Sequence, residues 1–311
     1  MNKIKTLLIG SGEFAIPLFK TAMQLDFLDI TGIVTQPDKP FGRKQKMQGS
    51  PVFEVLKDEP LVKTSNIKFF KPVKFRNEYQ PILEETNPEL VLVASYGQIL
   101  PSEFIEYPKY KALNFHGSIL PQLRGAVPVQ MAILQGLKET GVTLQVMSQG
   151  MDEGDIISTR STAILEGDTT ETLMNNLSTL GVEILQTDLS KYLELDIKPK
   201  PQGNINVTYC YKADIEKEKA EIKFETDINL AERMIRAFYP WPIAYVVYQG
   251  RMLKIFKSQI HSNQSSSKTL QIRREGKNLL LDLQNGTLEL LELQLEGKKR
   301  DVSNNYLFLV D

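Results

Sequence analysis

The sequence predicts an α/β fold, in which a doubly wound parallel sheet is followed by a smaller β-rich domain. In the first half of the chain, short aliphatic runs alternate with segments of helical periodicity, which is the rhythm of βαβ units. In the last third, short strand-like segments follow one another between turns, which is typical of a small barrel or sandwich. A length of 311 residues allows two such domains.

Apolar runs mark the strands of the first half. Lys5–Ile9 ends in a glycine, and Leu90–Ala94 is apolar throughout, as a strand buried on both faces would be. Further strands are expected at Ile30–Thr35, Ala112–Phe115 and Val142–Met147, and helices at Phe14–Leu25, Val127–Leu134 and Thr169–Leu193. This alternation predicts a Rossmann-like sheet covered by helices.

A proline-containing segment separates the two halves. Residues 196–206 hold two prolines and a glycine among polar residues, which stiffens the backbone and is typical of a linker. We therefore expect an N-terminal domain over 1–195 and a C-terminal domain over 207–311. In the C-terminal domain we expect a helix at Ile228–Phe238, strands at Ala244–Tyr248, Met252–Phe256, Thr269–Ile272, Leu279–Leu283 and Leu288–Leu293, and turns at Gln249-Gly250 and Asn285-Gly286.

Charge and cysteine content exclude several classes of protein. Lys and Arg number 37 against 38 Asp and Glu, so a nucleic acid could be bound only by a local basic patch. Cys210 is the single cysteine, which excludes a disulfide framework and a multi-cysteine zinc site. No apolar run approaches the roughly 18 residues of a membrane helix. We expect a cytoplasmic protein without a bound metal and without membrane contact.

A glycine loop directly follows the first predicted strand. Its residues, Gly10-Ser11-Gly12-Glu13-Phe14-Ala15, fit the G-x-G-x-x-A pattern of dinucleotide-binding loops. That pattern also needs an acidic residue at the end of the second strand, and there Asp38 comes late, after a proline. The loop therefore favours a tight turn, and an NAD-dependent oxidoreductase stays as a less favoured alternative.

The densest polar cluster begins where a central strand is predicted to end. Asn114 and His116 are two positions apart, so they project to the same side of that strand. Asp152 lies in a glycine-bracketed acidic loop after another strand. An asparagine amide can hold a developing oxyanion, a histidine can move a proton near neutral pH, and an aspartate can orient the imidazole. The set implies no serine or cysteine nucleophile, so it favours acyl transfer between two bound substrates.

The same region resembles the folate-dependent formyltransferases. The residues that match in order and spacing are Asn114, His116, Ser118, Leu120, Pro121, Arg124, Gly125, Pro128, Gly141, Val142, Thr143, Asp152, Gly154 and Asp155. The resemblance implies that Asn114, His116 and Asp152 are catalytic and that 10-formyltetrahydrofolate is the formyl donor. It further implies folate contacts at Ser118, Ile119, Leu120 and Pro121, with a pocket wall at Tyr96, Gly97 and Gln98.

Three features favour the branch of this family that formylates the α-amino group of initiator methionyl-tRNA for translation initiation. Residues 35–47 resemble the basic loop of that branch, which implies tRNA contacts at Lys39, Arg43, Lys44 and Lys46. Residues 235–245 resemble a signature that follows the linker in the same branch. The C-terminal sequence is similar to the OB-like domain of the family, and OB folds commonly hold nucleic acid.

Two other readings of the resemblance are weaker. A sugar-nucleotide N-formyltransferase would share the chemistry, but the basic loop and the signature at 235–245 argue against it. A purely RNA-binding protein is disfavoured because the three catalytic residue types are intact. We expect the protein to act as a monomer.

Overall fold

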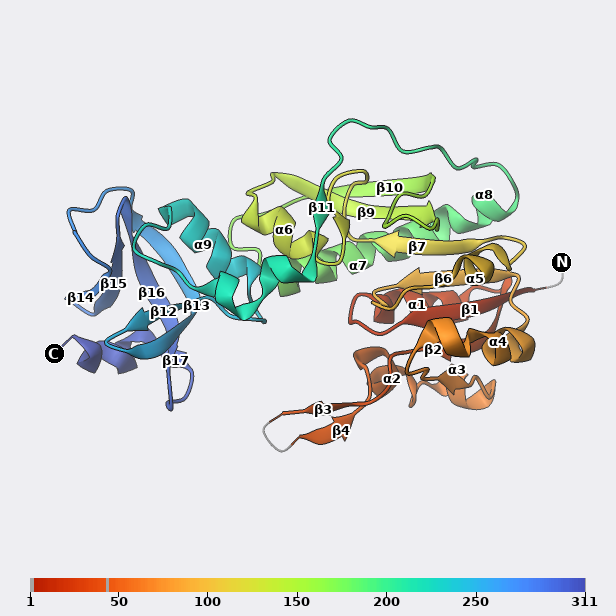
Figure 1. Ribbon diagram of the computed structural model, residues 1–311, viewed down its shortest axis with the longest axis horizontal. Coiled ribbons are helices and arrows are strands. Elements are labelled where there is room, and N and C mark those ends of the chain that lie inside the picture. The colour runs from red at the N-terminus through yellow and green to blue at the C-terminus, as the bar shows by residue number, and fades with distance from the viewer. Residues whose placement is uncertain (1–2, 43–44, 311) are drawn as a thin grey trace. The chain divides into compact units, whose positions relative to one another are not determined.

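The computed structural model describes residues 3–42 and 45–310. The chain forms two compact units (Figure 1). The first unit comprises Met1–Ala126, Thr140–Thr162 and Met174–Tyr209, and the second comprises Val127–Glu139, Ala163–Leu173 and Cys210–Asp311. Among the described residues, no helix is both long and apolar enough to cross a membrane.

The first unit is built on a seven-stranded sheet. Its strands are β1 (Ile4–Gly10), β2 (Leu28–Val34), β5 (Phe69–Phe70), β6 (Leu90–Ala94), β7 (Ala112–His116), β9 (Glu139–Val146) and β10 (Ile156–Ala163). They lie in the order β10-β9-β7-β6-β1-β2-β5. All pairs from β5 to β7 are parallel, which confirms the predicted α/β class.

Strand β9 departs from the predicted direction, because it runs antiparallel to β7. A parallel return needs a helix that crosses over the sheet between the two strands. The helix that precedes β9, α6 (Pro128–Leu134), instead belongs to the second unit. The chain therefore re-enters the sheet in the opposite direction.

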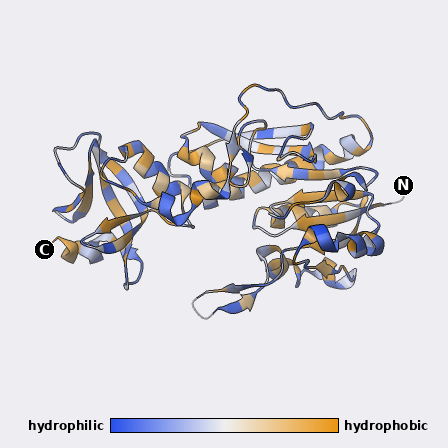
Figure 2. Cartoon of the chain, viewed as in Figure 1, coloured by the Kyte–Doolittle hydropathy of each residue, from blue (hydrophilic) through white to orange (hydrophobic). Residues whose placement is uncertain are grey.

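Helices and short strands complete the first unit. They are α1 (Ala15–Gln24), α2 (Pro51–Leu56), α3 (Pro60–Thr64), α4 (Phe75–Thr86), α5 (Ser102–Glu106), α7 (Thr170–Thr187, of which residues 170–173 belong to the second unit), α8 (Leu189–Leu193), the hairpin of β3 (Lys39–Phe41) and β4 (Lys46–Gln48), and β8 (Arg124–Gly125). Leu7 and Ile9 of β1 share a buried core with Val91 and Val93 of β6 and with residues of α4 and α5. Hydrophobic residues accordingly concentrate in the strands of this sheet (Figure 2).

The long helix predicted at Thr169–Leu193 is interrupted at Asp188. The Asp188 carboxylate accepts hydrogen bonds from the Ser158 hydroxyl and from Thr187 Oγ1, and it pairs with Arg160 at 2.8 Å. Ser158 and Arg160 lie on β10. A tertiary contact with the sheet therefore divides the segment into α7 and α8.

The predicted linker is hydrogen-bonded to the first unit. Ile156 and Lys200 exchange two backbone hydrogen bonds, of 2.8 and 2.9 Å. Further on, the Arg124 N–H donates to the Thr208 carbonyl at 2.9 Å, just before β11 (Tyr209–Cys210). The segment thus follows a fixed path, and the domain limits expected from the sequence stay a prediction.

The second unit contains an antiparallel sheet with the strand order β12-β13-β16-β15-β14, and β17 pairs with β16. Register shifts at three points of the β13–β16 ladder bend the sheet into a half-barrel, as bulges do, which confirms the barrel-like class. Its elements are η1 (Lys212–Ile215), η2 (Lys217–Ala220), α9 (Ile228–Ala237), β12 (Tyr245–Tyr248), β13 (Arg251–Ser262), β14 (Gln271–Glu275), β15 (Asn278–Leu283), β16 (Gly286–Leu295), β17 (Asp301–Val302) and η3 (Ser303–Leu309).

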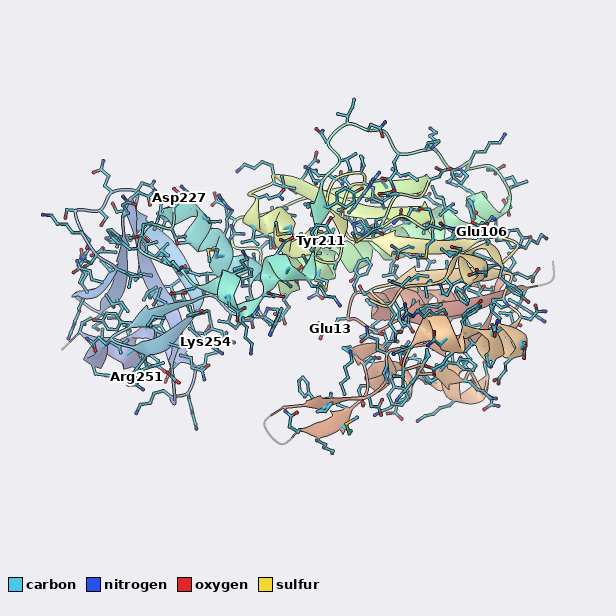
Figure 3. All side chains as sticks on the ribbon, in the orientation of Figure 1. Glu13, Glu106, Tyr211, Asp227, Arg251 and Lys254 are labelled. Atoms are coloured by element: carbon cyan, nitrogen blue, oxygen red, sulfur yellow. The ribbon has the colours of Figure 1, made fainter. Side chains whose placement is uncertain are left out.

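The predicted hairpin turn at Gln249-Gly250 lies where the sequence places it, whereas Gly286 of the second predicted turn already begins β16 and pairs with Leu283. Gln249 and Gly250 have φ of +50° and +74°, as the two central residues of a type I′ turn require. At the other turn, Asn285 has a different role, because its Oδ1 accepts the Ile228 N–H at 3.0 Å and its Nδ2 donates to Asp227 at 2.7 Å. Asp227, labelled in Figure 3, is the N-cap of α9.

Candidate functional site

Two neighbouring strands bring four polar side chains together in the first unit. In the register of β7 and β9, Asn114 lies opposite Gln145 and His116 lies opposite Thr143. Because side chains two apart share a face of the sheet, this pairing forms a polar patch at the end of β7. His116, Thr143 and Gln145 are buried, and Asn114 is partly buried.

The carboxylate of Asp152 lies at the centre of this patch. Its Oδ1 accepts from Asn114 Nδ2 at 3.2 Å and from Gln145 Nε2 at 2.8 Å. Its Oδ2 accepts the Gly125 N–H at 2.9 Å and lies 3.5 Å from His116 Nδ1. The structure therefore brings together all three residues that the sequence predicts to be catalytic.

The hydrogen bonds of His116 fix the roles of its two ring nitrogens. Nε2 lies 2.8 Å from the Leu123 carbonyl, which can only accept, so Nε2 carries a proton. Nδ1 is then the basic atom of the neutral ring, and it faces Asp152. A second proton on the ring would lie between Nδ1 and the carboxylate.

The loop after β7 contains the predicted folate contacts Ser118, Ile119, Leu120 and Pro121, and Thr143 anchors it. Thr143 Oγ1 donates to the Ser118 carbonyl at 2.8 Å and accepts the Leu120 N–H at 3.2 Å. The Ser118 hydroxyl donates to the Gln122 carbonyl at 2.5 Å. The loop is thus pinned to β9 beside His116, and its contact with folate stays a prediction.

The second predicted folate segment follows β6. The ring of Tyr96 is buried against Phe75, and burial raises the pKa of its phenol. The side chain of Gln98 accepts the Phe75 N–H at 2.8 Å at the start of α4. The predicted folate contacts at Tyr96, Gly97 and Gln98 stay a prediction.

The glycine loop uses its own amides within the chain. The N–H groups of Ser11 and Gly12 both donate to the Ser95 carbonyl, at 3.1 and 3.2 Å. After β2, the Gln36 N–H donates to Ser11 Oγ at 2.9 Å. These amides are the donors that a dinucleotide phosphate would need, so the loop acts as the tight turn favoured by the sequence.

The predicted basic loop is an exposed hairpin of β3 and β4. Lys39 and Lys46 are exposed, whereas Arg43 and Lys44 lie outside the described residues. Asp38, the acid of this loop, pairs with Lys71 at 2.5 Å, which leaves the charge of the hairpin basic. Phe41 is also exposed, at 68% of its surface.

Sequence reasoning missed three residues that organise the site, namely Gln145, Gln202 and Arg124. Arg124 was part of the family pattern, but no role was assigned to it. Its guanidinium donates to Gln202 Oε1 at 2.9 and 3.1 Å and lies 3.4 Å from Glu153. The available signal was the polar Gln145 between Leu144 and Val146 in a predicted strand. In the described part of the chain, no group of three His, Cys, Asp or Glu could hold a metal ion.

Family comparisons cover nearly the whole chain. The formyl transferase family matches residues 2–189, and the formyl transferase C-terminal domain matches residues 214–307. The methionyl-tRNA formyltransferase of Caldanaerobacter subterraneus subsp. tengcongensis is 35% identical over 306 residues, which are 98% of this chain and 96% of the relative. The enzyme of the same name from Hydrogenobaculum sp. is 37% identical over 95% of this chain and 94% of its own.

Solved structures share the fold at lower identity. The N-formyltransferase of Helicobacter canadensis, in complex with folinic acid and dTDP-3-aminofucose, has a TM-score of 0.65 at 19% identity, covering 92% of this chain and 98% of its own. HypX of Aquifex aeolicus, in complex with tetrahydrofolic acid, has a TM-score of 0.65 at 15% identity, covering 98% of this chain and 47% of its own. At these sequence identities, the comparison shows a shared fold and nothing about the substrate.

Proposed function

Because the chain belongs to the formyl transferase family, we propose that it moves the formyl group of 10-formyltetrahydrofolate to the α-amino group of initiator methionyl-tRNA. The observation that carries the proposal is the Asp152 carboxylate, which gathers Asn114 and His116 at one strand end. Relatives named for this activity match both halves of the chain. Such a reaction belongs in the cytoplasm, where initiator tRNA is used.

Asn114 stabilises the charge that develops in the reaction. One N–H of its amide donates to Asp152, which fixes the orientation of the side chain. An amide nitrogen has two hydrogens, and the second can donate to the formyl oxygen as that atom becomes negative. Asp152 thus holds in place the group that assists the formyl oxygen.

His116 and Asp152 together accept the proton that the attacking amine releases. The amine forms a bond to the formyl carbon and sheds a proton, while the departing folate nitrogen gains one. Nδ1 of His116 and Oδ2 of Asp152, 3.5 Å apart, can hold that proton between them. The Leu123 carbonyl keeps the ring oriented throughout.

The donor and the acceptor have separate places in the proposal. The loop of Ser118 to Pro121, pinned to β9 beside His116, would hold the folate. The exposed lysines of the β3–β4 hairpin would contact tRNA phosphates, and the half-barrel would add a nucleic-acid surface. The proposed active form is a monomer without a metal.

A formyl-transfer assay tests the function. The protein and 10-formyltetrahydrofolate are given charged initiator tRNA in one reaction and a nucleotide-linked amino sugar in another, with mass detection of the products. We expect formylmethionine in the first reaction alone. Product in the sugar reaction alone would contradict the proposed acceptor while keeping the chemistry.

Two variants test the catalytic residues. We expect Asp152→Asn and His116→Asn to lower kcat by about 10²–10⁴, the usual contribution of acid–base catalysis, with the Kd for tRNA unchanged. Asp196→Asn and His261→Asn are matched controls, because Asp196 is exposed and His261 lies on β13 in the second unit. A catalytic variant with the kcat of its control would overturn the assignment.

A further inference from the structure

We propose that Gln202, in the segment after α8, is a positioning residue that holds the Asp152 loop in its reactive geometry. Gln202 Nε2 donates to the carbonyl of Asp152 at 2.8 Å and to the carbonyl of Gly154 at 2.7 Å. It also lies 3.4 Å from Oε1 of Gln145. One amide group therefore contacts the catalytic loop and a side chain that binds the catalytic carboxylate.

Arg124 sets the orientation of this amide. Its guanidinium can only donate, and its Nε and Nη2 both donate to Gln202 Oε1, at 3.1 and 2.9 Å. Since the oxygen of Gln202 faces Arg124, its nitrogen must face the two carbonyls of the loop. Arg124 is itself buried, with 8% of its surface exposed, so the orienting group is held in place.

The Asp152 loop needs such support because of its backbone conformation. Asp152 has a φ of +56°, in the left-handed region that a non-glycine residue rarely adopts. The hydrogen bonds from Gln202 hold carbonyls on both sides of Glu153, at Asp152 and at Gly154. A change in this backbone would move the Asp152 carboxylate relative to Asn114 and His116.

The segment that carries Gln202 is fixed two residues before it, at Lys200. Lys200 exchanges backbone hydrogen bonds with Ile156, and the prolines at 199 and 201 limit the rotation of the chain between them. The backbone that carries Gln202 to the Asp152 loop is therefore restrained. We infer that this part of the predicted linker acts as a component of the active site.

Two substitutions of Gln202 separate its contacts. Gln202→Glu keeps an acceptor for Arg124 but places an oxygen against the carbonyls of Asp152 and Gly154. Gln202→Met has a side chain of similar length and removes the hydrogen bonds to Arg124 and to the two carbonyls. If Gln202 acts on the loop, we expect both variants to lower kcat by about 10- to 100-fold, with the KM for tRNA and folate within about twofold. Asn204→Ala, an exposed change two residues on, is the matched control.

A wild-type kcat in Gln202→Glu would overturn the proposal, because pairing with Arg124 alone would then suffice. The Asp152→Asn background gives a second test. If Gln202 acts through Asp152, adding Gln202→Met to Asp152→Asn lowers kcat by less than about twofold further. An equal fold loss in both backgrounds would show that Gln202 acts independently of Asp152.

A spectroscopic measurement on the enzyme without substrates separates this inference from the proposed function, on which its kinetic part rests. The chain has two histidines, so the imidazole NMR signals of His116 are assigned with His261→Asn. We expect Gln202→Met to shift the His116 signals, while Asn204→Ala leaves them unchanged and both variants keep the wild-type circular dichroism. Unshifted His116 signals in a folded Gln202→Met would refute the positioning role, whatever reaction the enzyme performs.

Discussion

Asp152 and Leu123 both hold left-handed backbone conformations beside the candidate site, with φ of +56° and +57°. A leucine side chain has no polar atom that could stabilise this region locally, so the conformation of Leu123 is held by the surrounding structure, which includes the hydrogen bond from its N–H to Thr208 Oγ1 at 2.8 Å. It presents the Leu123 carbonyl to His116 Nε2. Asp152 tolerates the region better, and its side chain faces four nitrogen atoms. The geometry of the site therefore depends on backbone conformations as much as on residue types.

Gly154 sets the close approach of the Asp152 loop to β9. A Cβ at this position would lie 1.6 Å from the Val146 carbonyl oxygen, so the loop or β9 would have to move to accommodate it. We expect Gly154→Ala to lower the free energy of unfolding by about 1–3 kcal/mol, as overpacking does, and to lower kcat with it. Urea unfolding measures the first effect and the formyl-transfer assay the second.

Gly203→Ala is the matched control for that change. A Cβ at Gly203 would meet no described atom within 4 Å, so we expect an unchanged free energy of unfolding. If both alanine variants unfold at the same urea concentration as the wild type, the close approach at Gly154 is not a constraint.

The sequence singles out the candidate catalytic residues more readily than the side chains that contact them. Asn114, His116 and Asp152 are polar or ionisable types at or after strand ends, and the structure places Asn114 within hydrogen-bonding distance and His116 within ion-pair distance of Asp152. Gln145 and Gln202 are common polar types outside the family pattern. The contact of Gln202 with Asp152 joins residues 50 positions apart in the sequence, so it depends on a path of the chain that no local pattern encodes.

At the scale of elements, local signals and tertiary contacts differ in what they predict. The Gln249-Gly250 turn is marked by Gly250, which adopts its φ of +74° without steric cost, so the local sequence predicts the turn. The direction of β9 depends on where α6 packs, and the break between α7 and α8 depends on contacts with β10. Such features cannot be obtained from periodicity within one segment.

The junction of α7 and α8 makes a testable contribution to stability. Burial alone would raise the pKa of Asp188, but hydrogen bonds from Ser158 and Thr187 and the charge of Arg160 outweigh it and lower that pKa. A folded pKa below the unfolded value of about 3.9 stabilises the fold above that pH. The stabilisation is then lost as the pH falls through the folded value.

We therefore expect Asp188→Asn to lower the free energy of unfolding at pH 7, and the gap to the wild type to shrink as the pH falls below about 4. Urea unfolding over a pH series measures this, with the exposed Asp196→Asn as the control. A gap that stays constant across the series would show that the Asp188 charge does not contribute.

At the scale of the whole molecule, the net charge of the chain does not favour binding of the proposed substrate. The chain carries a net charge of −1, so its overall field does not attract a polyanion such as tRNA. Binding must come from local groups, and Lys39 and Lys46 on the exposed hairpin are such groups. The ion pair of Asp38 with Lys71 keeps the one acid of this loop occupied.

This arrangement predicts the salt dependence of tRNA binding. Each phosphate contact releases counterions, so removing one contact reduces the slope of log K against log salt by about 0.7–0.9. We expect Lys39→Ala and Lys46→Ala each to reduce the slope by about that amount and to raise the KM for tRNA, with kcat nearly unchanged. Lys63→Ala is the control, because Lys63 lies on α3, outside the hairpin sequence, and pairs with Asp58 at 2.8 Å. If the hairpin variants match this control over the same salt range, the hairpin does not bind phosphates, and the acceptor must be held by other basic groups of the chain.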